Sequence, residues 1–178
     1  MTPPPRPARH TPVSESEGLL RIEPLLVPPT TDVLTAIRQA AEHPETRVVG
    51  VVDPTGRLIG VVPILRLAEA VVARVAPEAI MSTLTRLQDI ADFGHAIEAR
   101  TVGEAMLPPI SVAPTATIDD AFRRMHERHQ SGIHVVDDDG RPIGYLDLLE
   151  LALIYADVLE GHTRASPADT DEPSDEPS

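Results

Sequence analysis

The chain has 178 residues, of which 42% are hydrophobic and 2% aromatic, and its formal net charge is −13. This composition predicts a globular protein whose core is built from aliphatic side chains. The negative charge argues against nonspecific nucleic-acid binding, because the phosphates would be repelled. The chain has neither cysteine nor lysine. This excludes disulfides, thiol catalysis, a phosphate-loop lysine and Schiff-base chemistry.

The two ends of the chain differ in composition from its middle. Residues 1–17 are rich in Pro, Arg, Ser and Thr, and residues 161–178 are acidic and contain Pro and Ser. Both segments are predicted to be disordered tails. No apolar run reaches the ~20 residues needed to cross a bilayer, and the first residues lack the apolar stretch of a signal peptide. We therefore expect a cytoplasmic protein with no membrane insertion.

A β-α-β-β-α pattern occurs first over residues 18–75. A short strand over 23–27 precedes a helix capped by Asp32, whose inward face is predicted to carry Leu34, Ile37, Ala40 and Ala41. A β-branched strand over 47–53, a turn at Gly56, a second strand over 57–62 and a helix over 64–74 complete the unit.

The same pattern returns over residues 101–160. After a strand over 109–112, Thr117 and Asp120 form a capping box before a helix with Ile118, Ala121, Phe122 and Met125 inward. Two strands over 133–137 and 141–146, joined by an Asp-Gly turn, lead to a helix over 147–159. Neither copy has enough apolar residues to close a core, so the copies should pack against each other.

Residues 76–100 join the two copies and do not repeat. Apolar side chains at positions 80, 84, 87 and 90 have helical spacing. We expect a helical connector whose apolar face covers the repeat pair or a partner subunit.

Three segments carry a family resemblance. Residues 51–62 and 135–146 resemble the core signature of CBS domains (cystathionine-β-synthase repeats), and residues 101–114 resemble the start of a second CBS repeat. The resemblance implies a mixed α/β fold of two repeats related by a pseudo-twofold axis and packed through their sheets. It also implies a homodimer, an adenosine-containing ligand in clefts between the repeats, and a regulatory role without catalysis.

The family's nucleotide signature can be followed through both copies. It places a Ser or Thr, which holds phosphate, at the start of the last helix and an Asp, which accepts hydrogen bonds from ribose, one turn later. The first copy has Pro63 and Arg66 there, and neither side chain supplies the required group. The second copy has Asp147, which repels phosphate and is suited to capping the helix, and Glu150, which offers ribose a longer acceptor. A nucleoside-like ligand at this second half-site is the form of binding we expect.

Further ligand-binding candidates follow from the same resemblance. His134 and Gly50 occupy a strand position that is often proline beside the family's cleft. The full set of candidates is Gly50, Pro63, Arg66, Ile110, Ser111, Val112, His134, Asp147 and Glu150. We expect no catalytic residue and no metal site, because the spacing of His126, His129 and His134 is not diagnostic of a metal.

Three functions remain open from the sequence. The first is a regulatory module that senses AMP, ATP or another adenosyl compound and signals to a protein partner. The second is a dimerisation and interaction scaffold that binds no ligand. The third is a divalent-cation module that binds Mg²⁺, suggested by the carboxylates of Asp147 and Glu150. A thermal-stability screen with nucleotides and magnesium separates the three.

Overall fold

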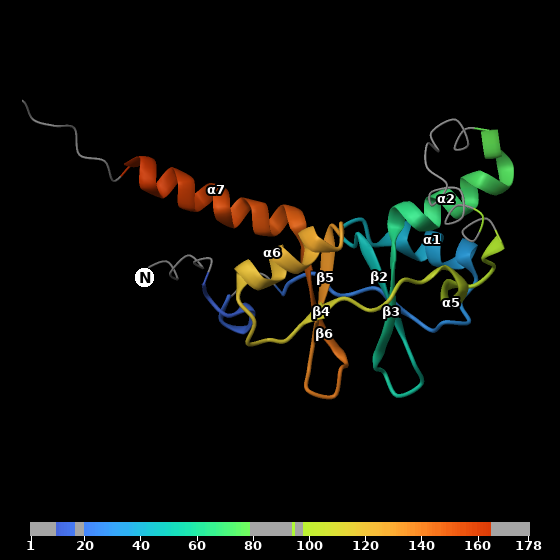
Figure 1. The fold of residues 1–178 in the computed structure, drawn as a ribbon, viewed down its shortest axis with the longest axis horizontal. Helices are drawn as coiled ribbons and strands as arrows, with labels where there is room; N and C mark the ends of the chain where they lie inside the picture. The colour runs from blue at the N-terminus through green and yellow to red at the C-terminus, as the bar shows by residue number, and fades with distance from the viewer. Residues whose placement is uncertain (1–9, 17–19, 79–93, 95–97, 165–178) are drawn as a thin grey trace, which may run out of the picture.

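Two three-stranded sheets form the centre of the protein, as seen in a computed structural model that describes residues 10–16, 20–78, 94 and 98–164 (Figure 1). The first sheet has the order β1-β2-β3 and the second β4-β5-β6. The strands of the first are β1 (Leu26–Val27), β2 (Val48–Val52) and β3 (Leu58–Pro63). Those of the second are β4 (Ser111–Val112), β5 (Gly132–Val136) and β6 (Pro142–Asp147).

The two sheets share one pairing scheme. In each, a short first strand runs parallel to the central strand and the third strand pairs with it antiparallel. Gly50 lies opposite Val61 in the first sheet, and His134 lies opposite Tyr145 in the second. Both ladders shift register one residue before the end of the central strand. The predicted tandem repeat and mixed α/β fold are therefore confirmed.

The four longer helices lie in the upper part of the view, and the turns of both β-hairpins project at the lower edge (Figure 1). The longer helices are α1 (Val33–Glu42) and α2 (Ile64–Val75) in repeat 1, and α6 (Ile118–Glu127) and α7 (Leu148–Arg164) in repeat 2. Two short helices are η1 (Val13–Glu15) and α5 (Val102–Ala105). The predicted caps are present: Asp32 accepts the N–H of Leu34 at 2.8 Å, and Thr117 forms its capping box with Asp120.

The inward faces of the two first helices differ in part from the prediction. In α1 the buried residues are Val33, Ala36 and Ala40, while Leu34 is 39% exposed. The buried alanines let α1 approach its neighbours closely. Ile37, also predicted to face inward, is partly buried and packs against the same core, whereas Ala41 is exposed. In α6 the predicted face is right except for Phe122, which is partly exposed and lies edge-on to Tyr155.

Each repeat completes the core of the other. The cluster centred on repeat 2 includes Val48 and Val61 of repeat 1, and the cluster centred on repeat 1 includes Ala99, Val102 and Ala105, which precede repeat 2's first strand. The segments are also joined by backbone bonds: Val61 and Leu107 exchange N–H···O contacts at 3.0 and 2.8 Å. This agrees with the expectation that neither copy closes a core alone.

The turns of the two hairpins lie side by side. The N–H of Leu58 donates to the carbonyl of Gly140 at 2.9 Å, and Nε of Arg141 donates to the carbonyl of Thr55 at 3.1 Å. Gly56 and Gly140 have φ values of +84° and +78°, which a residue with a side chain rarely adopts. The hairpins therefore hold the repeats together at the end remote from the last helices.

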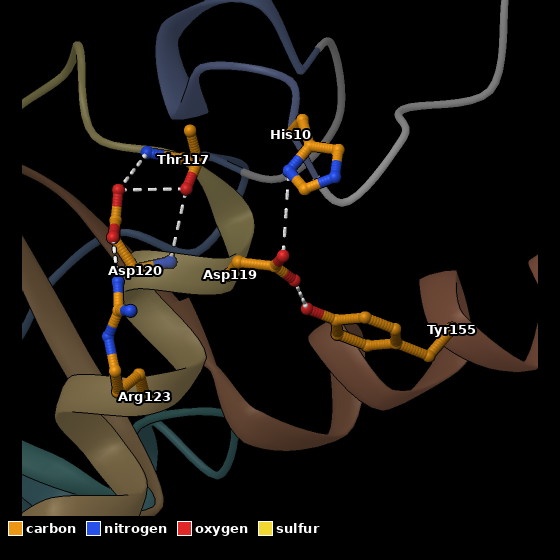
Figure 2. A network of polar contacts seen from close by, with 6 residues as sticks. All are labelled: His10, Thr117, Asp119, Asp120, Arg123 and Tyr155. Carbon is orange, nitrogen blue, oxygen red and sulfur yellow. Dashed lines mark hydrogen bonds and ion pairs between the residues drawn. The ribbon is translucent and has the colours of Figure 1, made fainter.

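Part of the segment expected to be a mobile tail is packed against repeat 2. Val13 is fully buried, and its N–H donates to the carbonyl of Ala116 at 2.9 Å. Nearby, Nδ1 of His10 lies 3.6 Å from one carboxylate oxygen of Asp119, and the Tyr155 hydroxyl donates to the other (Figure 2). The sequence prediction was wrong for residues 10–16, because a single buried valine among prolines and serines gives no periodic signal.

The predictions for the two tails and for the helical connector mostly concern residues outside the described ranges. These are the tail before residue 10, the tail after residue 164 and most of the helical connector, residues 79–93 and 95–97. The last helix continues to Arg164, beyond the predicted boundary at 160. Within the described ranges, every helix is too short or too polar to span a membrane.

Candidate functional site: a cleft between the repeats

A cleft of about 460 Å³ lies between the start of β2 and the start of α7. Repeat 1 contributes Arg21, Ile22, Pro44, Glu45 and Arg47, and repeat 2 contributes Asp147, Leu149, Glu150 and Leu153. The volume is within the range of small-molecule sites. Because both repeats line the cleft, a ligand there would contact both.

Asp147 ends β6 and caps α7. Its Oδ1 accepts the N–H of Leu149 at 2.8 Å, as the sequence predicted for a capping residue. Its Oδ2 is buried, lies 3.7 Å from Nε of Arg47 and accepts no hydrogen bond from the described residues. Asp147 is 6% exposed. A free N–H at the start of α7, which would otherwise attract an anion, is thus already occupied by a carboxylate.

Glu150 lies in the first turn of α7 and is half-buried. Its Oε2 also has no hydrogen-bond partner within the described part of the chain. Burial raises the pKa of this carboxyl, and the nearby charges of Asp147 and Glu45 raise it further, while Arg21 opposes them. The cleft therefore holds two carboxylate oxygens without a hydrogen-bond donor among the described residues, and the two carboxylates are close enough to influence each other's charge.

Tyr145 positions the opposite wall of the cleft. Its buried hydroxyl accepts the N–H groups of Arg47 at 3.0 Å and Val48 at 3.1 Å, which belong to the other repeat. Burial raises the pKa of this hydroxyl, so it stays protonated. Repeat 2 thereby holds the start of β2, and with it Arg47, against the end of β6.

His134 and Gly50 face each other across the seam between the sheets and do not line the cleft. His134 is fully buried, and neither ring nitrogen has a hydrogen-bond partner among the described residues. Burial lowers its pKa to about 4, so the ring is neutral at pH 7. A Cβ on Gly50 would lie 2.8 Å from Nε2 of His134 and 2.6 Å from Cδ2 of Leu26. The pair is a packing contact.

The corresponding positions of repeat 1 are arranged differently. Pro63 precedes α2 and makes no side-chain capping bond. Nε of Arg66 donates to the carbonyl of Ala105 at 2.7 Å, which ties α2 to the end of α5. Where repeat 2 presents two carboxylates to a cleft, repeat 1 therefore presents a proline and a bonded guanidinium.

The remaining candidates lie apart from the cleft. Ile110 and Ser111 line a separate polar hollow of about 290 Å³ beside Arg124. Val112 belongs to the core and is 2% exposed. Of the nine candidate residues, the structure places Asp147 and Glu150 in the cleft.

Sequence reasoning missed the residues that repeat 1 contributes, above all Arg21, Glu45 and Arg47. The position of Glu45 and Arg47 just before a strand was readable, since both directly precede β2. Which end of β2 approaches α7 depends on how the repeats pack, and a single repeat does not show that.

The chain belongs to the CBS domain family. The family model matches residues 13–73 and 102–157, one match for each repeat, so the chain contains a tandem CBS pair. No enzyme family is matched, and no curated protein is similar enough in sequence to be matched to the chain.

Solved structures with the same fold are also CBS pairs. A CBS domain-containing protein from Thermotoga maritima is 23% identical, with a TM-score of 0.64 over 82% of this chain and 94% of the other. The CBS domain pair of protein MJ0100, in complex with 5′-methylthioadenosine and S-adenosyl-L-methionine, is 18% identical, with a TM-score of 0.62 over 84% and 98%. CBSX2 from Arabidopsis thaliana, in complex with AMP, is 23% identical, with a TM-score of 0.58 over 83% and 98%. These likenesses show the fold.

Proposed function

We propose that the protein is a regulatory CBS pair that senses an adenosine-type ligand in the cleft between its repeats and signals the occupancy to a partner. The observation that carries the proposal is the cleft itself, which combines room for a nucleoside with two buried carboxylate oxygens that no described residue hydrogen-bonds. Buried acceptors without partners are costly, and ligand hydroxyls would supply the missing donors.

The lining residues suit the two parts of a nucleoside. Glu150 Oε2 is an acceptor for ribose hydroxyls, in the position where the family's signature has an aspartate. Ile22, Pro44 and Leu153 offer apolar surface for a purine ring. The counterpart position holds Arg66, whose guanidinium carries only donors and so offers ribose no acceptor. Its Nε already donates to the carbonyl of Ala105. We propose one ligand per chain.

The route of the signal follows from the same arrangement. A ligand that contacts Arg47 and Glu150 at once favours the spacing between β2 and α7 that fits it. The helix α7 extends from the cleft for 17 residues, and Leu153 and Leu159 are exposed on it. A change in the angle of α7 would therefore be presented to a partner along an apolar surface.

The homodimer expected from the family resemblance is a proposal of the same kind. It is supported by the exposed apolar side chains of α6 and α7, among them Phe122 and Leu159. Light scattering at micromolar concentration should give twice the chain mass. A monomer would contradict this part of the proposal.

A thermal-shift screen tests the function. Adenosine, AMP, ATP, S-adenosylmethionine and NAD are each added at up to millimolar concentration, and one of them at 100 times its Kd should add about 2.7 kcal/mol of stability. Glu150→Ala should abolish the shift, whereas Glu42→Ala, an equal change on the exposed end of α1, should keep it. If no adenosyl compound moves the melting temperature but Mg²⁺ does at matched ionic strength, the proposal fails.

A further inference from the structure

We infer that this cleft selects adenosyl ligands whose 5′ substituent is cationic or uncharged, and rejects those with a phosphate at that position. The inference rests on the proposed function and narrows it to a class of ligand. It follows from the arrangement of charge around Asp147 and Glu150, in which this chain departs from the phosphate-holding hydroxyl of the family signature.

The start of α7 is closed to an anion. Asp147 Oδ1 takes the N–H of Leu149, and the same carboxylate fills the place beside the helix start. A helix N-terminus attracts phosphate through free N–H groups and its positive dipole, and here a negative side chain satisfies both. Since Asp147 is 6% exposed, water screens its charge poorly. A 5′-phosphate would meet direct repulsion.

The innermost charges of the cleft are negative, and the positive ones lie outside them. Asp147 is buried and Glu150 half-buried, whereas Arg21 and Glu45 are exposed and the side chain of Arg47 is 54% exposed. Arg47 is also partly neutralised by its ion pair with Asp147. A ligand group that sits at the inner end of the cleft, between β2 and α7, is therefore closest to carboxylates.

The free acceptor atoms favour a ligand that brings donors. Asp147 Oδ2 and Glu150 Oε2 accept no hydrogen bond from the part of the protein that the structure describes. Removing a carboxylate from water without giving it a hydrogen-bond donor costs free energy. An ammonium group would offset this cost for both carboxylates, through its positive charge and through its hydrogen bonds. A sulfonium would supply the charge alone. A phosphate would supply neither.

Three nucleosides that differ only at the 5′ position test the inference by isothermal titration calorimetry at constant ionic strength. They are 5′-amino-5′-deoxyadenosine (a cation), adenosine (neutral) and AMP (an anion). We expect the amine to bind about tenfold more tightly than adenosine, and adenosine about tenfold more tightly than AMP.

A variant isolates the role of the charge. Asp147→Asn keeps a capping oxygen for Leu149 and removes the charge, since Asn caps helices as well as Asp does. It should reduce the preference for the amine over AMP by about tenfold or more. Asp138→Asn, the same charge change on the exposed hairpin at the other end of β6, should leave the preference unaltered.

The outcomes separate the two proposals. If AMP binds the unaltered protein as tightly as adenosine, or if Asp147→Asn leaves the preference unchanged, the inference is overturned while the proposed function stands. If none of the three nucleosides binds the unaltered protein and no adenosyl compound of the thermal-shift screen moves its melting temperature, the proposed function is overturned, and the inference falls with it.

Discussion

Repeat 1 and repeat 2 have the same strands in the same register, yet they differ at the residues where they meet. The equivalent pairs, repeat 1 first, are Val48 and Gly132, Gly50 and His134, Val61 and Tyr145, Pro63 and Asp147, and Arg66 and Glu150. The turn glycines and the caps, which build the fold, are conserved between the copies in position. The residues of the seam and of the helix starts are not.

At the seam between the sheets, the largest side chains come from repeat 2. Repeat 2 supplies the large side chains, His134 and Tyr145, and repeat 1 supplies space for one of them at Gly50. The Tyr145 hydroxyl then crosses to the start of β2 and holds it in place. A symmetric fold thus acquires an asymmetric seam, and the starts of its two last helices acquire different chemistry.

The largest effect is expected for Gly132→Ala. A Cβ there would lie 1.7 Å from the Tyr145 hydroxyl oxygen, which is buried and hydrogen-bonded to two N–H groups. We expect a loss of about 3 kcal/mol or more in the free energy of unfolding, measured by urea denaturation. Gly94→Ala is the control, because a Cβ there meets nothing within 4 Å. Equal stabilities for the two variants would contradict the asymmetric packing.

The next effect is a pH dependence from His134. Burial lowers its pKa from 6.5 to about 4, so the unfolded chain takes up a proton first as the pH falls. The stability is complete above pH ~6.5 and decreases towards pH ~4, by about 3 kcal/mol at most.

His134→Leu should remove this part of the acid destabilisation and flatten the stability curve between those pH values. His43→Leu, at an exposed position after α1, should not. A His134→Leu curve parallel to that of the unaltered protein would show that the ring does not titrate as its burial implies.

Tyr145→Phe should destabilise the protein by about 1–3 kcal/mol, because the N–H groups of Arg47 and Val48 lose their acceptor. Tyr155→Phe is the matched control, and its loss should be smaller, since that hydroxyl donates to a partly exposed carboxylate. Chemical denaturation measures both. A larger loss of stability for Tyr155→Phe than for Tyr145→Phe would contradict the role of Tyr145 in holding the two repeats together.

The smallest effect has the opposite sign. Glu150→Gln should stabilise the ligand-free protein at pH 7 by less than about 1 kcal/mol, because Glu150 is partly desolvated and repelled by Asp147 and Glu45. The raised pKa means that the folded state binds this proton more readily than the unfolded state. The gain should therefore shrink as the pH falls and Glu150 becomes protonated. A destabilised Glu150→Gln variant would contradict this electrostatic account.

Much of the fold could be predicted from the sequence because its signals are local. The β-branched strands, the Asp-Gly turn at Gly140 and the caps at Asp32 and Thr117 each depend on residues within a few positions. The second copy then confirmed the first. The role of Val13 was not predictable in this way, because its contacts lie about 100 residues away.

The site was predictable only in part, for the same reason. The family signature led to Asp147 and Glu150, and both line the cleft. The same signature also led to Pro63 and Arg66, where the bond to Ala105 gives a different arrangement. Which residues lie opposite Asp147 is determined by the packing of the two repeats. A sequence pattern within one repeat carries no information on that packing.

A crystal structure of the protein with adenosine is the most direct test of the claim that the two repeats differ as ligand sites. We predict one nucleoside per chain, in the cleft between Arg47 and Glu150, with a ribose hydroxyl donating to Glu150 and no ligand beside Arg66. A nucleoside bound beside Pro63 and Arg66, with the Asp147 cleft empty, would contradict the account.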